Sequence, residues 1–460
     1  MDVIIIGGGI SGLSAAYELE RRGISFTLLE ASTRLGGLIR TEYLDGFTVE
    51  AGPESVLAQK PAALQLCDEL GLGPRIVSSL TPRTAFILHG PRLLPVPSPS
   101  LLGIPLTLKG LLNYGVLPPG ARARVALELF VRRAQVSGDE SVASFFARRF
   151  GRATVPLIAA PLLGGIHAGR VDALSMQSLF PRFVEAEKNR GSVLRAFRHS
   201  HAGVATDGAF RTLSSGMGEL VSAIGRRLPP GSVRLASGAG TLSKADDVWR
   251  VGTPQGNVDA RSVVLAAPAY AAARLLMSVD QESSSLCAGI QYVSSVGVTL
   301  AYSREQVAHP LQGSGFVVAR TGNAARLTAC TWVSSKWAGR APQGSVLLRA
   351  FLGGANDPSA IDLSDDDLTG IVTRELSTVL GISGAPLLAL VHRWRDAGAQ
   401  HNVGHAERIA RLEARLARYP GLFVAGSGFR AVGIPDCVTD GRSAAASAAE
   451  FVRQGANPQV

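Results

Sequence analysis

The first forty residues constrain the fold more than any other part of the chain. An apolar, β-branched run, Val3 to Ile6, is followed at once by Gly7-Gly8-Gly9-Ile10-Ser11-Gly12. The run predicts a buried parallel strand, and the glycines predict a tight turn into a helix. A second short strand, Phe26 to Leu29, ends at Glu30, which is placed to bind a ribose hydroxyl. Strand, glycines, helix, strand and acid in this order predict a Rossmann-like α/β unit that binds a dinucleotide.

Each glycine of the motif has a separate structural task. Gly7 allows the tight turn at the strand end, and Gly12 allows the helix to pack close to the strand. Gly9 lets a pyrophosphate approach the backbone without meeting a Cβ atom, and the unpaired amides at the helix start face the phosphates. A lone glycine motif is a weak indication. A purely structural turn would leave Glu30 unexplained, so the complete unit favours a nucleotide site.

The residues after Glu30 distinguish between dinucleotides. The segment Ala31-Ser32-Thr33-Arg34-Leu35-Gly36-Gly37 contains an arginine followed by a pair of glycines. It resembles the extension found in the FAD-binding amine oxidase superfamily, which NAD dehydrogenases usually lack. The resemblance therefore favours FAD.

The length of 460 residues is too great for one compact core and predicts two or three domains. With 46% hydrophobic and 18% charged residues, the composition is that of a folded globular protein. No run approaches the roughly 18 apolar residues of a membrane span, and the apolar start has no basic flank, so neither a transmembrane helix nor a secretory signal is expected. The scattered cysteines favour reduced thiols in the cytoplasm; they are Cys67, Cys287, Cys330 and Cys437.

The formal net charge of +10 is compatible with an acidic partner. Because no basic segment is interleaved with aromatic residues, nucleic acid is not expected to be that partner. Residues 101–135 combine many leucines with lysine and arginine. This segment is interpreted either as an amphipathic surface in peripheral contact with a membrane or as helices packed on the protein's own core.

Strand patterns return after a long helical region. Residues 141–201 are expected to be helical apart from a glycine-rich turn at 163–170, and strands are expected at 233–235, 248–251 and 263–266. The last of these is typical of a strand in the nucleotide-binding sheet, so that domain is expected to be discontinuous. Its predicted parts are residues 1–80, 205–280 and 395–460, with a mainly helical insertion at 81–204 and a substrate-binding domain at 281–394.

Two further local predictions follow from turn residues. Strands at 85–88 and 92–94 are expected to be joined at Gly90-Pro91. Near the C-terminus, a turn is expected at residues 432–436, followed by a helix of small residues from Gly441 to Phe451.

Motifs spread along the whole chain resemble those of the oxygen-dependent porphyrinogen oxidases of haem biosynthesis. The broad resemblance lies in VIIIGGGISGL, Gly36-Gly37, Gly52-Pro53-Glu54-Ser55, the turn from Gly164 to Gly169, Ala209-Phe210-Arg211-Thr212-Leu213, Val403-Gly404-His405 and Gly433-Ile434-Pro435-Asp436-Cys437. Similarity to the bacterial coproporphyrinogen III oxidases is narrower and lies in Ala85 to His89, Gly103-Ile104-Pro105, Thr328 to Trp332 with Lys336-Trp337, and Ile361 to Asp365. The implied fold class is α/β: a Rossmann-like FAD-binding domain of the glycine-doublet oxidase type, a strand-rich substrate domain and a helical insertion.

The resemblance also implies which residues contact noncovalently bound FAD. These are Gly7, Gly8, Gly9, Ile10, Ser11, Gly12, Glu30, Ala31, Arg34, Gly36, Gly37, Gly52, Pro53, Glu54, Ser55, Ala239, Trp394, Val432, Gly433 and Ile434. Val432, Gly433 and Ile434 lie in a loop expected beside a helix N-terminus. The amides and dipole of such a loop would interact favourably with the electron-rich pyrimidine edge of the isoalloxazine. Judged without the resemblance, Trp394 is equally well explained as a core aromatic residue.

The implied reaction is the six-electron oxidation of coproporphyrinogen III to coproporphyrin III by three O2, giving three H2O2. The protein would hold the macrocycle in a wide apolar cleft and place arginines near its four propionates. The implied setting is the cytoplasm or the inner face of the membrane, with a ferrochelatase as downstream partner. The alternatives are a protoporphyrinogen IX oxidase on the same frame, another FAD amine oxidase or desaturase-type enzyme, and a nonenzymatic flavoprotein.

Several positions depart from the pattern of the relatives. Ala399-Gln400-His401 stands where they tend to have proline and tyrosine around the glutamine, His167 and Arg170 replace tyrosine and aspartate, and Glu54 replaces a smaller polar residue. These differences concern substrate contacts more than the flavin. A lone histidine in a glycine turn is more often a packing residue than a catalyst, so no catalytic residue is assigned.

Metal and nucleophile sites are not expected. His401 and His405 have the i, i+4 spacing of metal ligands, but Gly404 interrupts them and no acidic third ligand is positioned. Cys437 lies in the turn near the expected flavin, where a covalent link is conceivable. The sequence Pro-Asp-Cys matches the porphyrinogen oxidases, which hold FAD noncovalently.

Overall fold

The computed structural model describes residues 1–133, 138–200, 208–322 and 325–455. Its lower part is built on a parallel sheet with the strand order β12-β2-β1-β16-β22. The central strand β1 (Val3–Ile6) pairs in parallel with β2 (Phe26–Leu29) and with β16 (Ser262–Leu265), while β12 (Val233–Arg234) and β22 (Leu422–Val424) form the edges. The segment predicted at 263–266 is therefore confirmed as a strand of this sheet.

The residues of β1 alternate between two cores. Val3 and Ile5 pack into one apolar core, whereas Ile4 and Ile6 pack into another on the opposite face. A continuous apolar run is required because both faces of the sheet are covered. One face carries α1 (Ile10–Arg21), α2 (Ala62–Glu69), α10 (Gly218–Arg227) and α16 (Ile434–Gly455). The other carries β13 (Thr241–Ala245), β14 (Val248–Thr253), β15 (Gly256–Ala260), α11 (Ala269–Leu276), α12 (Gln281–Ala288) and α15 (His405–Leu416).

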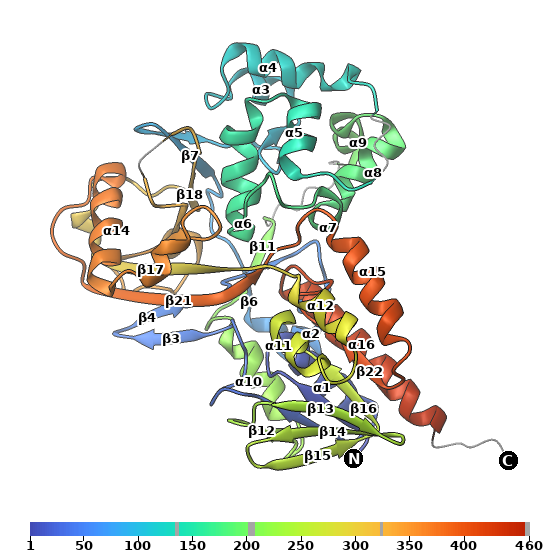
Figure 1. Ribbon diagram of the computed structural model, residues 1–460. Helices are drawn as coiled ribbons and strands as arrows, with labels where there is room; N and C mark the ends of the chain where they lie inside the picture. Colours follow the sequence, from blue (N-terminus) through green and yellow to red (C-terminus); the bar gives the residue numbers. More distant parts are fainter. Residues whose placement is uncertain (134–137, 201–207, 323–324, 456–460) are drawn as a thin grey trace.

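A second, mostly antiparallel sheet forms one side of the molecule (Figure 1). Its strands in spatial order are β21 (Leu388–Ala399), β17 (Tyr292–Ser303), β20 (Ser345–Gly353), β19 (Ala329–Trp332), β18 (Gly315–Val318), β7 (Ala85–His89) and β8 (Arg92–Pro95). The helix α14 (Asp365–Leu380), capped by the Ser364 hydroxyl, packs its apolar side against this sheet. The predicted strand pair at 85–88 and 92–94 is confirmed as β7 and β8.

The long strands β17 and β21 connect the two sheets. Each has twelve residues, and they pair antiparallel from the lower body into the second sheet (Figure 1). The ladder has one irregularity, between Val293 and Ser295. Both strands therefore lead from the lower body into the second sheet, although among the described residues neither pairs with a strand of the parallel sheet.

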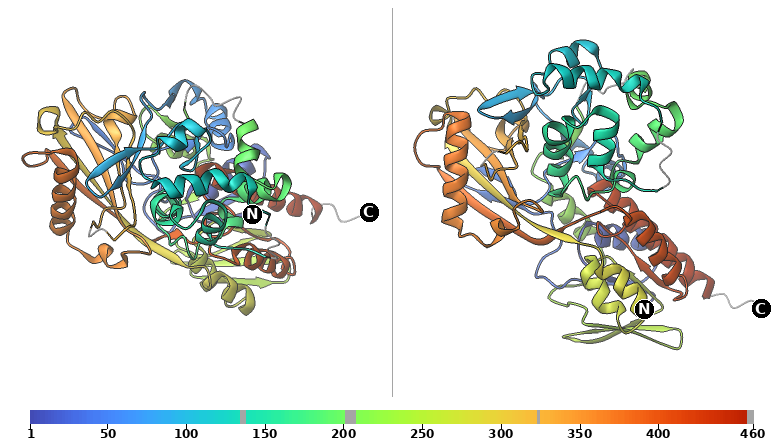
Figure 2. Two further views of the ribbon diagram at one scale, coloured as in Figure 1. Left: turned by 90° about the horizontal axis from the view of Figure 1, so that it is seen from above. Right: turned by 45° about the horizontal axis from the view of Figure 1, so that its top comes forward.

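A group of helices lies above both sheets (Figures 1 and 2). They are α3 (Leu108–Leu112), α4 (Pro119–Ala126), α5 (Val142–Phe150), the π-helix η3 (Val155–Gly164), α6 (Gly165–His167), α7 (Met176–Leu179), α8 (Pro181–Arg190) and α9 (Val193–Ser200), together with the 3₁₀ turn η2 (Leu127–Phe130). Their apolar side chains form a separate core. In that core the fully buried Arg149 is paired with Glu128, as a buried charge requires.

The segment 101–135 is partly core and partly surface. Leu111 and Val125 are buried, but Leu108, Leu112 and Phe130 are 61%, 59% and 78% exposed. Residues 134 and 135 lie outside the described part. No helix among the described residues is long and apolar enough to cross a membrane.

Shorter elements complete the fold. They are the strands β3 (Thr41–Leu44), β4 (Phe47–Glu50), β5 (Val56–Leu57), β6 (Ile76–Ser78), β9 (Ser100–Leu101), β10 (Ile104–Pro105) and β11 (Phe210–Leu213), the helix α13 (Val333–Lys336), and the 3₁₀ turns η1 (Gly73–Arg75), η4 (Arg304–Gln306) and η5 (Pro358–Asp362). The division into domains stays a prediction.

The last helix corrects one prediction. It begins at Ile434, seven residues before the predicted start at Gly441, so Ile434, Pro435 and Asp436 belong to the helix and not to a turn. Pro435 is tolerated because an N–H in the first helical turn has no intrahelical acceptor. Pro435 therefore marks the start of the helix and not a turn, contrary to the prediction. Val432 and Gly433 consequently lie directly before a helix N-terminus.

Candidate functional site

In the glycine loop after β1, Gly7 and Gly12 are tight against backbone atoms, Gly8 is close to side chains, and Gly9 is open. A Cβ atom on Gly7 would lie 2.7 Å from the Ala266 carbonyl oxygen, and one on Gly12 would lie 1.9 Å from the Gly7 oxygen. Gly7 also has a φ of +110°, which favours glycine. A Cβ on Gly9 would meet no atom within 4 Å. The fold therefore requires glycine at positions 7 and 12, while the Gly9 backbone faces open space, as close approach of a pyrophosphate requires.

The acid at the end of β2 is held against this loop. The Glu30 carboxylate accepts hydrogen bonds from the Gly8 N–H at 2.6 Å and from the Ser32 N–H at 2.7 Å. The Glu30 carbonyl accepts the Ser237 N–H at 2.8 Å, and a Cβ on Gly238 would lie 3.2 Å from that of Ala31. The structure thus places the segment that includes Ala239 beside Glu30 and Ala31.

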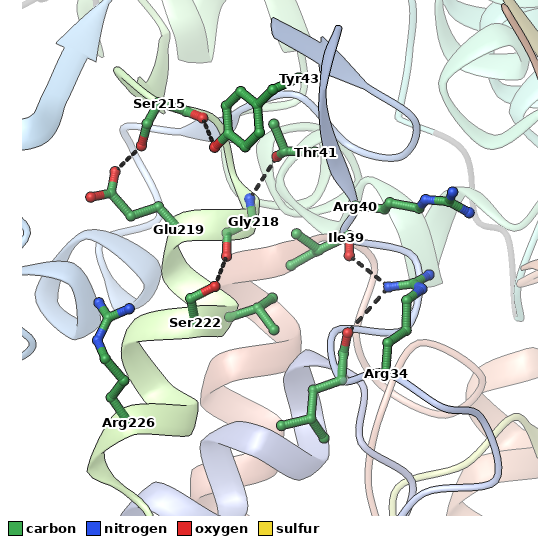
Figure 3. Close-up of a pocket in the computed structure, with 12 residues that line it drawn as sticks. Arg34, Ile39, Arg40, Thr41, Tyr43, Ser215, Gly218, Glu219, Ser222 and Arg226 are labelled. Carbon is green, nitrogen blue, oxygen red and sulfur yellow. Dashed lines mark hydrogen bonds between the residues drawn. The ribbon is translucent and has the colours of Figure 1, made fainter. Parts of the chain in front are cut away.

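The arginine and glycine pair close over the glycine loop. Gly36 forms a parallel bridge to Gly9, and a Cβ on Gly37 would lie 3.1 Å from the Gly9 Cα. The Arg34 guanidinium donates to the carbonyls of Leu35 and Ile39, each at 3.1 Å (Figure 3). Burial, together with the nearby Arg40 charge, holds the pKa of Arg34 below its ordinary value. Arg34 therefore braces the loop that carries the glycine pair.

A cavity of about 390 Å³ opens beside this brace (Figure 3). It lies between the segment after β2, the strand β3 and α10, and residues 7–12 do not line it. Its lining residues are Arg34, Leu35, Ile39, Arg40, Thr41, Tyr43, Ser215, Gly218, Glu219, Val221, Ser222 and Arg226. Arg34 therefore lies between this cavity and the glycine loop.

The turn from Gly52 to Ser55 is fixed by side chains from the second sheet. Arg349 donates to the carbonyls of Ala51 and Gly52, each at 2.6 Å, and the Trp394 indole N–H donates to the Ala51 carbonyl at 2.8 Å. Glu54 forms an ion pair with Lys336. The structure thus brings Trp394 and the turn together, although Trp394 and its acceptor Ala51 are 343 positions apart in the chain.

The charge of Glu54 is set by its neighbours. Burial disfavours ionisation of this carboxyl, but the Lys336 and Arg349 charges outweigh it and hold the pKa of Glu54 below its usual range. One of its oxygens, Oε2, has no partner among the described residues. Glu54 is therefore an ionised anchor between the turn and the second sheet.

The two ends of the chain meet at this site. A Cβ on Gly441 of α16 would lie 2.1 Å from the Ser11 carbonyl oxygen of α1, so the two helices are in backbone contact. Asp436, in the first turn of α16, forms a salt bridge with Lys60 at 2.7 Å. Val432 and Gly433 therefore reach the same edge of the sheet as the glycine loop. The Cys437 thiol is buried, and burial raises its pKa to about 11, which is unsuited to a nucleophile.

Three histidines lie close to this edge. The His401 and His405 rings stack with centroids 3.9 Å apart, and their Nε2 atoms bond to the carbonyls of Ser427 and Phe429. Burial lowers the pKa of both His167 and His405 to about 4, and the nearby His401 ring adds a smaller effect in the same direction. These imidazoles are therefore neutral near pH 7. Among the described residues no group of three or more metal-ligating side chains occurs.

The segment from Gly164 to Gly169 lies where the helices meet the second sheet. The turn expected at 163–170 is corrected: η3 runs to Gly164 and α6 follows directly over Gly165–His167, so the chain turns only from Ala168, which is left-handed. The Gln400 amide donates to the His167 carbonyl at 3.0 Å, and the Ala355 N–H donates to the Ala168 carbonyl at 2.8 Å. The Ile166 side chain is 67% exposed although η3 before it is largely buried. A cavity of about 260 Å³ adjoins this turn and is lined by Arg170, Ala173, Gln291, Tyr292, Val293, Ala355, Gln400 and Asn402.

Sequence reasoning missed Arg349 as an anchor of the turn from Gly52 to Ser55. Its signal was a single charge within the apolar strand residues 345–353, where an unpaired arginine would be costly.

Comparison with known proteins agrees with this geometry. Residues 10–449 match the family described as flavin containing amine oxidoreductase. The chain is 35% identical to a coproporphyrinogen III oxidase of Bacillus subtilis, covering 98% of each protein, and 32% identical to one of Staphylococcus aureus, covering 96% of this chain and 98% of that one. A crystal structure of an Exiguobacterium protein, provisionally named protoporphyrinogen oxidase, superposes with a TM-score of 0.87 at 32% identity over 98% of each chain.

The chain therefore belongs to the flavin containing amine oxidoreductases. It is an oxidoreductase with a flavin cofactor, as its sequence predicts.

Proposed function

We propose that this protein is an FAD-dependent oxidase that converts coproporphyrinogen III to coproporphyrin III in haem biosynthesis, using three O2 and releasing three H2O2. The observation that supports it most strongly is the similarity over 98% of the chain to a coproporphyrinogen III oxidase. The site is compatible with FAD because Gly9 faces open space beside Glu30. The turn at 52–55 and the segment 432–434, where α16 begins, adjoin the same sheet edge.

The residues that would hold FAD have distinct tasks. Residues 7–12 would bind the pyrophosphate. Glu30 and Ala31 would bind the ribose, with Ala239 beside them. The turn at 52–55 and the segment 432–434 would contact the isoalloxazine. Arg34, Gly36 and Gly37 would close the loop over the nucleotide, and Trp394 would fix the first turn through its bond to Ala51. When bound, FAD supplies the acceptor for hydride from a methylene bridge of the substrate.

The chain's own contribution is orientation and exclusion of water. The turn at 164–169 and the second sheet would hold the apolar macrocycle, and arginines would neutralise its propionates. No residue is assigned as a base.

The test follows porphyrin fluorescence after anaerobically purified protein is mixed with coproporphyrinogen III and then exposed to O2. We expect oxidation well above the uncatalysed rate, dependent on FAD, with H2O2 as coproduct. A colourless protein that does not bind added FAD, or a rate equal to autoxidation, would contradict the proposal.

A protoporphyrinogen IX oxidase is the second candidate, favoured by the name of the Exiguobacterium structure. The two substrates differ in the number of propionates, four against two. Parallel measurement of kcat/KM for both rings decides between the candidates, and we expect the higher value for coproporphyrinogen III.

We further propose a cytoplasmic protein whose helices contact the membrane surface and that passes its product to a ferrochelatase. Support for membrane contact comes from the exposed leucines Leu108 and Leu112 on α3 and from Phe130 in η2, with Lys109 beside them. Co-sedimentation with anionic vesicles, compared between the wild type and a Leu108→Ser, Phe130→Ser variant, tests this contact. Equal sedimentation of both proteins would refute it.

A further inference from the structure

Arg320 occupies a seam between three parts of the fold. It follows β18 by two residues, and its backbone N–H donates to the Pro156 carbonyl at 3.0 Å, at the start of η3. The preceding Ala319 is part of the core of the upper helices. Arg320 therefore lies where the second sheet meets the π-helix that leads into the turn at 164–169 (Figure 1).

The Arg320 side chain is partly buried, yet its guanidinium has no hydrogen-bond acceptor among the described residues. Burial holds the pKa of Arg320 below its ordinary value, and the nearby Asp357 opposes that shift. The Asp357 carboxylate is already occupied, because Arg326 donates to both of its oxygens at 2.8 Å. Arg320 therefore carries a charge that the described protein atoms do not neutralise directly.

The other arginines of residues 281–394 differ from Arg320. One is exposed to solvent, and the rest donate to carbonyls or carboxylates within the protein. The exposed one is Arg374, and the bonded ones are Arg304, Arg326, Arg340, Arg349 and Arg393. Arg320 alone in this set combines partial burial with a guanidinium free of described acceptors.

Asp357 connects Arg320 to the turn that faces the second sheet. The Asp357 N–H donates to the Gly354 carbonyl at 3.2 Å, and the next residue, Ala355, donates to the Ala168 carbonyl at 2.8 Å. Arg320 and the turn at 164–169 thus lie at opposite ends of η3 and border the same segment, 354–357. A tetrapyrrole with extended side chains is large enough to contact both.

We propose that Arg320 binds a propionate carboxylate of the tetrapyrrole. This inference rests on the proposed function and names one cation that holds the substrate. A guanidinium binds a carboxylate through two parallel N–H···O bonds, which lysine cannot reproduce. Because the contact is remote from the reacting bridge carbon, it contributes to binding and orientation and not to the chemical step.

The experiment compares the wild type with Arg320→Met, which keeps the length of the side chain and removes its charge. Equilibrium binding of coproporphyrin III, which carries the four propionates of the substrate and is not turned over, is followed by fluorescence anisotropy. We expect the dissociation constant to rise about tenfold, with KM for coproporphyrinogen III rising similarly and kcat changing less than about twofold.

Three controls make the result specific. The tetramethyl ester of coproporphyrin III should bind to wild type and Arg320→Met equally, because it has no carboxylate. Arg320→Lys should recover part of the affinity. Arg374→Met removes an exposed arginine on α14, at the outer edge of the molecule (Figure 1), and should behave as wild type. FAD content and thermal midpoint should be unchanged in all variants.

Equal binding of coproporphyrin III by wild type and Arg320→Met would overturn the inference, as would an equal loss for acid and ester. These outcomes are separate from failure of the proposed function. That failure would appear as a wild type that contains FAD but does not oxidise coproporphyrinogen III.

Discussion

Two turns at the candidate flavin site are held in place by different means. The loop at 7–12 is shaped by backbone contacts, since its tight glycines lie against carbonyl oxygens of its own βα unit and of Ala266. The turn at 52–55 is held by side chains from other parts of the fold, chiefly Arg349 and Trp394 of the second sheet and Lys336 of α13. The first turn is defined within a short stretch of sequence, whereas the second exists only when distant segments have packed. Substitutions at the tight glycines should therefore disrupt the loop itself, whereas loss of the side chains that hold the second turn should destabilise the protein and also move that turn.

The largest effect is expected within the glycine loop. Gly12→Ala places a Cβ 1.9 Å from the Gly7 oxygen and should destabilise the protein by about 3 kcal/mol or more. Gly9→Ala has space in the protein and a φ of −71°, which suits any residue, so the apoprotein should keep its stability. FAD affinity should nevertheless fall at least about tenfold, because the new methyl group would meet the pyrophosphate.

Urea unfolding of the apoproteins and FAD titration check this pair of variants. An apo Gly12→Ala protein as stable as wild type would show that the loop is not as tight as described. Unchanged FAD affinity in Gly9→Ala would show that the pyrophosphate does not bind next to Gly9.

A smaller loss is expected when the second turn loses its main donor. Arg349→Met leaves the carbonyls of Ala51 and Gly52 without this donor and should lower the free energy of unfolding by about 2–4 kcal/mol. The flavin absorption maximum should also shift, because the turn that we propose to contact the isoalloxazine would move. If Arg349→Met matches wild type in both measurements, the turn does not depend on the second sheet.

Glu54→Gln tests the charge beneath the same turn and should cost about 1–3 kcal/mol at pH 7. A carboxyl whose pKa is lower in the folded protein stabilises it above the unfolded pKa of about 4.3, and this stabilisation is lost as the pH falls through the folded pKa. The difference between wild type and Glu54→Gln should therefore shrink below about pH 4. Urea unfolding from pH 7 to pH 3 measures it, and a constant difference would mean that the folded pKa is not depressed.

The smallest effect is expected for Lys60→Met. Its partner is Asp436 in α16, but the Lys60 side chain is 47% exposed, and such pairs contribute about 1 kcal/mol or less. Thermal unfolding at low and high salt measures the change. A loss comparable with that of Arg349→Met would show that the C-terminal turn also depends on a side-chain anchor.

The comparison of the two turns also explains what sequence could predict. The β1 strand, the turn at Gly7 and the helix α1 follow from local sterics, and the structure has them as predicted. The roles of Arg349 and Arg320 depend on which segments meet in space, and a single sequence does not specify this. The early start of α16 was missed because Pro435 was taken as a turn signal, whereas the first helical turn accepts proline. The FAD contacts of individual residues stay predictions.

The ribbon of β17 and β21 has a mechanical consequence. Backbone hydrogen bonds run along two twelve-residue strands that belong to both halves of the protein, so rotating one half against the other would break part of that ladder. Bending of the two strands should cost the least free energy at the irregularity between Val293 and Ser295, where the ladder is already interrupted. The relative orientation of the two parts is thus restrained by this pair of strands, and amides beside the irregularity should exchange with solvent faster than their neighbours.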